Sequence, residues 1–362
     1  MTHILDVFGV LEDPRAANAR HDLLDILFIA LAATLCGAKN CAEMALFGRT
    51  READLCGILD LKHGVPSHDT FSKVFRHLNP EVFEQVFAEF MAVFGRAMQA
   101  QGVVAIDGKQ LRRAYGKGRS YAPQMMVTAW GTGMRMVLAC RAAPDGGEVA
   151  ATLELLRLVD LKGSLVTTDA LHCRRDTAAA LLEKGADYVL ALKGNQPTLH
   201  RAAQKLLEAA PVPDCAEMRE RNHGRVERRR AIVRTAPELA TMLDFPGLAA
   251  VGQITGTRTL QGKRQTQTRL FLLSRPLAPA ELLRTVRAHW DIENGQHWAL
   301  DVVFDEDLAR TRKDHGARNL AVLRRLALNI LRAHPDKGSL SGKSKRAGWD
   351  NRFLLSLFAH MR

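Results

Sequence analysis

The sequence predicts an α/β fold in which helices cover a mixed β-sheet, and three observations support this. Residues 103–141 contain three short apolar runs at close spacing, which is typical of antiparallel strands. Between residues 149 and 209, helical segments alternate with two more strand-like runs, which is typical of parallel strands. Two of the runs, VVAID at 103–107 and SLVTTD at 164–169, lead directly into an aspartate.

The order of these elements predicts which strands are neighbours. The strands are expected at residues 103–112, 124–130, 134–141, 164–169 and 188–192, and the helices at 149–161, 174–184 and 196–209. Three strands followed by helix, strand, helix, strand and helix is the order of a ribonuclease-H-like core. Its sheet is mixed and five-stranded with helices on both faces, and its first and fourth strands lie side by side.

Residues 1–97 precede the sheet and are predicted to form a helical domain. Residues 22–35 are apolar nearly all round, as expected of a core helix. Ser67 is a good N-cap for a later helix, and Pro80 suits the first turn of the next. This helix pair is compatible with a helix-turn-helix that reads DNA and equally with a plain bundle.

The chain changes character after the sheet. Residues from about 211 to 279 are rich in Arg, Gly and Thr and are interpreted as a β-rich insertion. Helix resumes near residue 279, so the catalytic domain is predicted to span residues 98–333, insertion included. Residues 334–362 form a basic tail rich in Gly and Ser, in which residues 341–352 are expected to be flexible.

Charge and composition narrow the class of partner. Lys and Arg exceed Asp and Glu by 12, which favours nucleic acid over a membrane as partner. The longest apolar run, residues 26–38, is too short to span a bilayer. The six cysteines form no C-x-x-C pair, so zinc-ribbon and redox motifs are not supported. Without a secretory signal, we expect a cytoplasmic protein.

Carboxylates at corresponding places suggest a metal site. Asp107 is on the first strand and Asp169 is at the end of the fourth, so the two side chains can share a divalent cation if these strands are neighbours. In HWDIENGQHW, on the helix after the insertion, Glu293 is the expected third acid. The alternatives for the third acid are Asp291, Asp301 and Asp305.

Three carboxylates suit Mg²⁺, with Mn²⁺ as a substitute. Two such ions about 3.5–4 Å apart would support in-line phosphoryl displacement. The four-residue spacing of His289, Glu293 and His297 leaves a zinc site as an alternative, although HExxH is absent. Each acid also has an ordinary explanation as a turn or solvent-facing residue.

Basic and polar residues near these acids are the predicted DNA contacts. Lys109 shares a strand face with Asp107. The other predicted contacts are Lys193, Asn195, Arg228, Arg229, Arg230, Arg287, His289 and His297. Trp290 and Trp298 fit either packing or stacking on a base.

Several segments resemble one family. AIDGKQLR, VTTDALHC, YVLALKGNQPTL, HWDIENGQHWALDVVFDEDLARTR and NLAVLRRLALNILR are similar to the ISAs-type, or H-repeat-associated, insertion-sequence transposases. Residues 13–38 and 64–75 resemble that family's N-terminal associated domain. The resemblance covers nearly the whole chain. It implies a DDE transposase with a ribonuclease-H-like core, two metal ions and the acid triad Asp107, Asp169 and Glu293.

The resemblance also implies partners, and the sequence departs from related transposases in one motif. The partners are the element's terminal inverted repeats and target DNA, with a homodimer in the DNA complex and a bacterial, nucleoid-associated location. Many related transposases carry Tyr-x2-Arg-x3-Glu-x6-Lys around the third acid. Here Val286, His289, Glu293 and Leu300 fill those positions, so a hairpin intermediate is not implied.

The predicted function is a transposase that cuts at the ends of its element and joins the 3′-hydroxyls to target DNA. Two other functions stay open: a metal-dependent nuclease or resolvase without strand transfer, and a non-catalytic DNA-binding remnant. The intact triad argues against the remnant. The insertion and the N-terminal helices argue against a minimal nuclease.

Overall fold

A computed structural model describes residues 8–97, 102–114, 124–143, 147–209, 214–222, 225–260 and 263–360. The strands are β1 (Val103–Gln110), β2 (Met125–Gly131), β3 (Met136–Ala143), β4 (Leu165–Thr168), β5 (Asp187–Leu192), β6 (Cys215–Asn222), β7 (Arg225–Thr235), β8 (Ala250–Leu260) and β9 (Lys263–Leu273). The helices before the insertion are α2 (Leu23–Leu35), α3 (Cys41–Thr50), α4 (Glu52–Cys56), α5 (His68–His77), α6 (Pro80–Ala97), α7 (Glu148–Leu158), α8 (Arg175–Glu183) and α9 (Pro197–Glu208). The later helices are α10 (Pro237–Leu243), α11 (Pro279–His289), α12 (Trp298–Val302), α13 (Gly316–Ala333), α14 (Leu340–Trp349) and α15 (Asn351–Ala359). Short turns are η2 (Ala170–His172), the π-helical η3 (Ile292–His297) and η4 (Glu306–Leu308).

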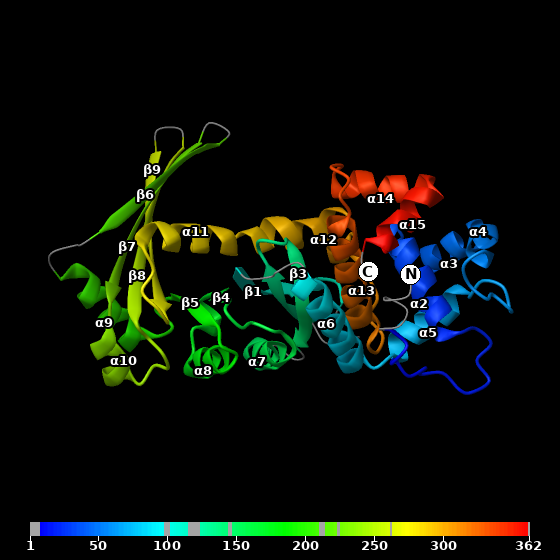
Figure 1. Cartoon of the computed structure of the whole chain (residues 1–362), viewed down its shortest axis with the longest axis horizontal. Coiled ribbons are helices and arrows are strands. Elements are labelled where there is room, and N and C mark those ends of the chain that lie inside the picture. The colour runs from blue at the N-terminus through cyan, green and yellow to red at the C-terminus, as the bar shows by residue number, and fades with distance from the viewer. Residues whose placement is uncertain are drawn as a thin grey trace.

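The described strands form one mixed sheet in the order β3-β2-β1-β4-β5-β9-β8-β7-β6 (Figure 1). β1 runs parallel to β4 and antiparallel to β2, so the predicted pairing of the first and fourth strands is confirmed. This mixed α/β architecture fits the ribonuclease-H-like class. The predicted limit of five strands is not confirmed, because β9 pairs with β5 and the strands of the insertion continue the sheet.

Helices cover both faces of the core strands, and strand alternation decides which side chain meets which helix (Figure 1). Ile106 of β1 packs in the cluster that contains Leu155 of α7. Ala105, one residue earlier, belongs to the opposite cluster together with Ile292 of η3. Asp107 therefore lies on the η3 face of the sheet.

The N-terminal helices share their core with the C-terminal part of the chain. Phe75 of α5, Trp130 of β2 and Leu326 of α13 belong to one cluster of buried side chains. The predicted caps are confirmed locally: the Ser67 hydroxyl accepts the hydrogen bond of an α5 N–H (3.3 Å), and Pro80 begins α6. The predicted boundary at residue 98 lies outside the described residues. In the described part of the chain, no helix is long and apolar enough to cross a membrane.

The prediction that residues 341–352 are flexible is wrong, because they belong to α14, to α15 and to the cap residue between these helices. Ser339 and Asp350 cap these helices by accepting hydrogen bonds from N–H groups of the first turn. The Lys343 ammonium donates to the carbonyls of Leu331 (2.9 Å) and His334 (2.8 Å) at the end of α13. A cation satisfies the free carbonyls at a helix C-terminus, so α14 is fixed against α13.

Candidate active site

The parallel pairing of β1 and β4 brings two aspartates to one edge of the sheet. The register pairs Ile106 with Thr168, so Asp107 and Asp169, which each follow by one residue, come next to each other. Asp169 ends β4 and caps η2, where its carboxylate accepts a hydrogen bond from the N–H of Leu171 (3.0 Å). The two strands thus deliver one carboxylate each to the same place.

Asp107 lies among other acids. Burial raises the pKa of Asp107 to about 7, against a hydrogen bond from the N–H of Gly108 (2.9 Å) that lowers it. The charges of three further acids also raise this pKa, those of Asp169, Glu148 and Glu293. Within the described residues, no Lys or Arg forms an ion pair with any of these carboxylates. Negative charge is therefore gathered here without a compensating side chain.

Glu293 reaches this place from the π-helical turn η3, directly after α11. Such turns are rare in proteins and frequent at functional sites. Gly295 allows the turn to pack closely, because a Cβ there would lie 2.8 Å from the Trp130 ring. The Glu293 side chain is exposed, and its carboxylate forms no hydrogen bond or ion pair with another described residue.

The alternative third acids all have structural partners; they are Asp291, Asp301 and Asp305. Their partners are, in the same order, Trp130 Nε1 at 3.1 Å, Lys109 Nζ at 2.7 Å and Lys39 Nζ at 3.4 Å. Glu293 is thus the acid of this segment whose carboxylate stays available to the site.

Lys109 is buried and forms ion pairs within the protein. Its side chain is 6% exposed, and its ammonium lies 2.7 Å from Asp301 and 2.9 Å from Asp307. Arg112 also contacts Asp307, at 3.1 Å. These pairs fasten β1 to the segment around α12 and η4, and they argue against the predicted DNA contact of Lys109.

Two of the predicted DNA-contacting residues are histidines beside the acids. His289 Nδ1 lies 2.9 Å from Thr167 Oγ1, and His297 Nδ1 lies 4.0 Å from Asp107 Oδ2. Burial lowers the pKa of His289 to about 4 and that of His297 to about 3. Both rings are therefore neutral near pH 7, so they line the acid site rather than offer a positive charge to phosphate.

The donor chemistry of the site fits a hard divalent cation. Carboxylate oxygens are the ligands that Mg²⁺ and Mn²⁺ take, and the acids lack a protein cation. Within the described ranges, no group of three or more His, Cys, Asp or Glu side chains already stands in a metal-holding arrangement. This is true of His289, Glu293 and His297, the zinc alternative, as it is of the three acids.

Two residues of this region were not predicted, namely Glu148 and His172. Glu148 opens α7, where an acid is common at any helix N-terminus, so its sequence position carries no specific signal. His172 stands three residues after Asp169, in VTTDALHC, and this closeness is the one local hint.

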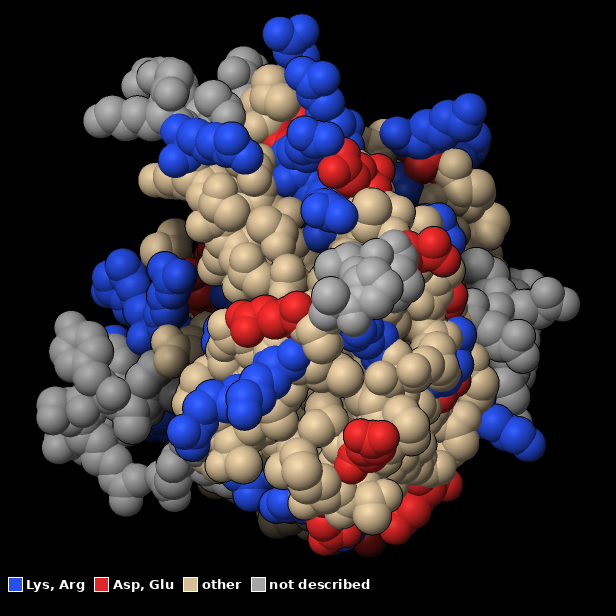
Figure 2. Space-filling view, turned by 90° about the vertical axis from the view of Figure 1, so that its left-hand side faces the viewer, with Lys and Arg blue, Asp and Glu red and all other residues tan. Residues whose placement is uncertain are grey.

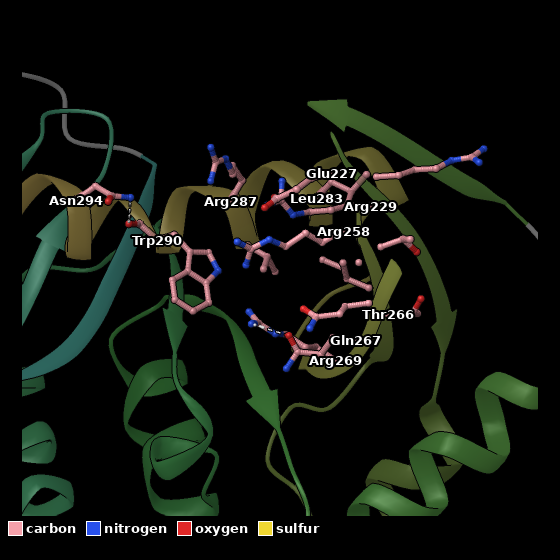
Figure 3. A pocket seen from close by; sticks show the side chains of 16 residues that line it. Glu227, Arg229, Arg258, Thr266, Gln267, Arg269, Leu283, Arg287, Trp290 and Asn294 are labelled. Atoms are coloured by element: carbon pink, nitrogen blue, oxygen red, sulfur yellow. Dashed lines mark hydrogen bonds and ion pairs between the residues drawn. The ribbon is translucent and has the colours of Figure 1, made fainter. Parts of the chain in front are cut away.

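A pocket of 680 Å³ lies between α11 and strands β7, β8 and β9 (Figure 3). Trp290 forms part of its wall, and the Arg269 guanidinium lies 4.9 Å from the Trp290 ring centroid. The basic residues that line the pocket are Arg228, Arg229, Arg258, Arg269 and Arg287. Trp290 and Asn294 also line it and flank Glu293 in the chain, so the pocket adjoins the acids.

The predicted arginines of β7 do not share one environment. Successive strand side chains alternate, so Arg228 and Arg230 point away from the face of Arg229. Arg228 pairs with Glu217 (Nε to Oε2, 2.9 Å), and Arg229 pairs with Glu220 (2.7 Å). Arg230 is exposed and has no ion pair within the described residues.

The insertion end of the molecule is basic. Figure 2 shows Lys and Arg gathered at the top of this end, over the hairpins, with acidic side chains along its lower rim. Arg287 of α11 pairs with Glu220 at 3.3 Å. Lys193 and Asn195 follow β5 and are exposed, and the Asn195 amide donates to the Ala170 carbonyl (2.9 Å), next to Asp169.

Two family descriptions match the chain. Residues 98–330 match "Transposase DDE domain", and residues 5–91 match "DDE_Tnp_1-associated". Together these matches span most of the chain.

Curated relatives have similar lengths. YncI of Escherichia coli O157:H7, named a candidate transposase, is 32% identical over 98% of this chain and 94% of its own. YhhI of Escherichia coli K12, named a candidate H repeat-associated transposase, is 30% identical over 98% of this chain and 97% of its own. Among solved structures, a piggyBac transposase synaptic complex with hairpin DNA matches 99% of this chain and 76% of its own, at 13% identity and a TM-score of 0.42.

Proposed function

We propose, because the chain belongs to the DDE transposase family, that it cuts DNA at the ends of an insertion sequence and joins the freed 3′-hydroxyls to target DNA. The residues we assign to this chemistry are Asp107, Asp169 and Glu293. One observation carries the assignment: the paired strands β1 and β4 present two neighbouring acids, and an acid without a side-chain partner approaches from η3.

We assign the same three carboxylates to holding Mg²⁺, for which Mn²⁺ would substitute. When bound, such ions neutralise the charge that develops on the transferred phosphoryl group. The protein holds the carboxylates in place beforehand: η2 fixes Asp169, and the N–H of Gly108 fixes Asp107. A preorganised site of this kind does not have to rearrange during the reaction.

DNA binding is assigned to the insertion pocket and its surroundings. Arg229, Arg258, Arg269 and Arg287 would contact phosphates, and Trp290 would stack on a base. What supports this is position, because the pocket adjoins Glu293 and lies at the basic end of the molecule (Figures 2 and 3). Exposed Arg230, Lys193 and Asn195 extend the same role, whereas Lys109 does not.

The partners follow from the reaction. The terminal inverted repeats of the element and the target DNA must meet at the acids. Two ends must be held together for transposition, so we expect a homodimer in the DNA complex. The N-terminal helices of residues 1–97 would add a second DNA contact.

The test is incubation of the protein with a labelled fragment that carries one inverted repeat, with Mg²⁺ or Mn²⁺ and a target plasmid. We expect nicks at the repeat boundary and joined products. Asp107→Asn should bind the fragment without cutting it, and Asp160→Asn, at an exposed turn, should behave as wild type. Nicks without joined products would favour the nuclease, and binding without any nick would favour the remnant.

A further inference from the structure

Glu148 is a carboxylate near Asp107 that the acid triad leaves without a role. It stands in the first turn of α7, which covers the opposite face of the sheet from η3. Its side chain is only 15% exposed. A glutamate is seldom buried to this extent unless something compensates its charge, and no Lys or Arg among the described residues does so.

Gly108 is the reason that Glu148 can come so close. In β1, Gly108 follows Asp107 and faces the α7 side of the sheet. A Cβ on Gly108 would lie 2.5 Å from Glu148 Oε1, so the carboxylate occupies the space that a side chain would fill. The missing side chain thus lets an acid from α7 reach the end of β1 beside Asp107.

His172 links this acid to the site. Its imidazole is completely buried, with Nε2 3.3 Å from Glu148 Oε1 and 3.8 Å from Asp169 Oδ1. Its Nδ1 has no hydrogen-bond partner in the described part of the chain. Buried polar atoms are normally satisfied, so a ring held with one nitrogen between two acids and the other unpartnered is unusual for simple packing.

We propose that Glu148 is a fourth carboxylate of the cation site and that His172 is the positioning residue that holds Glu148 and Asp169 together. The four acids then come from both faces of the sheet: Glu293 from η3, Glu148 from α7, Asp107 from within β1 and Asp169 from the position directly after β4. The inference rests on the proposed function only in taking the ligand to be a divalent cation.

A purely structural role for Glu148 predicts a different result. An acid in the first turn stabilises its helix through the helix dipole, and a contact with His172 would add to this. Under that explanation, replacement would lower thermal stability and leave cation affinity unchanged. The two explanations therefore differ in the property that changes.

The experiment measures Mn²⁺ binding to the full-length protein from the free-Mn²⁺ electron paramagnetic resonance signal, and Tm in EDTA. We expect Glu148→Gln to weaken Mn²⁺ binding about tenfold or more without lowering Tm, because it removes one of several like charges. The matched control is Glu154→Gln on the same helix, where the carboxylate is half exposed and pairs with Arg141 (2.7 Å). This control should bind Mn²⁺ as wild type does.

Two further variants test the geometry. His172→Gln should weaken Mn²⁺ binding by about 10-fold, the usual loss when a group that orients a ligand is removed. Gly108→Ala keeps every carboxylate but places a methyl group where Glu148 Oε1 lies, so it should weaken binding in the wild type and change nothing further in Glu148→Gln. Additive losses in that double variant would contradict the proposed contact.

The outcomes separate this inference from the proposed function. Unchanged Mn²⁺ affinity in Glu148→Gln, with affinity lost in Asp107→Asn, would overturn the fourth carboxylate and leave the triad intact. A lower Tm in EDTA with unchanged Mn²⁺ affinity would assign Glu148 to structure alone. If the wild type binds Mn²⁺ through Glu148 but does not cut the end fragment, the proposed function fails while this inference stands.

Discussion

Two clusters of charge lie two residues apart on the same face of β1, and they are built in opposite ways. Around Lys109, every acid meets a cation: Asp301 and Asp307 contact its ammonium at 2.7 and 2.9 Å. Next to them, Glu306 pairs with Arg325 at 2.9 Å, with neither side chain exposed. Around Asp107, several acids meet one another, and no Lys or Arg among the described residues pairs with them.

The difference indicates that the cluster around Lys109 serves stability and the cluster around Asp107 serves function. Where a buried acid pairs with a cation, replacing either partner lowers the free energy of unfolding, because the remaining charge is left buried without a partner. A buried acid surrounded by other acids costs folding free energy, since burial and repulsion both disfavour its charged form. An arrangement that costs stability in the free protein is explained most simply by a ligand that restores it.

The largest expected effect is on catalysis, at Asp107. Asp107→Asn should reduce cleavage of an end fragment by several orders of magnitude, because a charge that holds the cation is lost. Without metal, its Tm should not fall, since one repelling charge has gone. Nick mapping with Mn²⁺ and calorimetry in EDTA check the two parts. A variant that loses both stability and cleavage would break the comparison.

The next effect is on folding, at the paired cluster. Glu306→Gln removes the partner of fully buried Arg325 and should cost about 3–5 kcal/mol of unfolding free energy. Denaturant titration measures this, with exposed Glu183→Gln as the control. A loss near zero would show that this pair contributes no more than a surface pair does.

A smaller effect is expected at Lys109. Lys109→Met leaves Asp301 and Asp307 without their shared cation, and should cost about 1–3 kcal/mol, because both acids are partly exposed. The salt dependence of DNA binding should not change. If the salt slope falls by a unit instead, Lys109 contacts phosphate as the sequence predicted, and its ion pairs do not exclude that role.

The smallest expected effect is on DNA binding, and it compares an unpaired arginine with a paired one. Arg230 has no ion pair within the described residues, whereas Arg228 pairs with Glu217 on the neighbouring strand. Arg230→Ala should therefore lower the salt slope of DNA binding by about one unit, and Arg228→Ala by less. Gel shifts at several salt concentrations provide the slopes. Equal slopes for both variants would show that ion pairing does not predict which arginine meets DNA.

Much of the core fold could be predicted because its signals are local. Alternation of strands and helices gave the neighbours β1 and β4, and Ser67 and Pro80 marked helix starts. The extension of the sheet beyond β5 depends on pairing with the distant strand β9, as in Leu190 with Leu272, and no local pattern specifies it. The two C-terminal helices did have N-cap residues in the sequence, Ser339 and Asp350. The basic, Gly- and Ser-rich composition of the segment favoured a flexible tail instead.

The candidate site could likewise be predicted only in part. Asp107 lies in β1 and Asp169 follows β4, and the topology predicts that these strands pair, so the two acids could be brought together from the sequence. Glu148 could not, because its approach depends on the absent side chain of Gly108 and on the packing of α7 against β2 and β3. The π-helical turn that presents Glu293 could not be predicted either, since its sequence continues a helical pattern. The departure from an α-helix goes with the close packing of Gly295 against Trp130, which only the structure shows.

Helix α11 has a mechanical consequence. It contacts β6 and β7 of the insertion and also β1 and β4 of the core, and its last residue comes just before η3. Figure 1 shows it lying across the sheet between these two parts. A straight helix of this length measures about 16 Å, on the order of five base-pair steps of DNA. If the insertion binds DNA as proposed, this helix fixes the distance along the DNA between that contact and the acids.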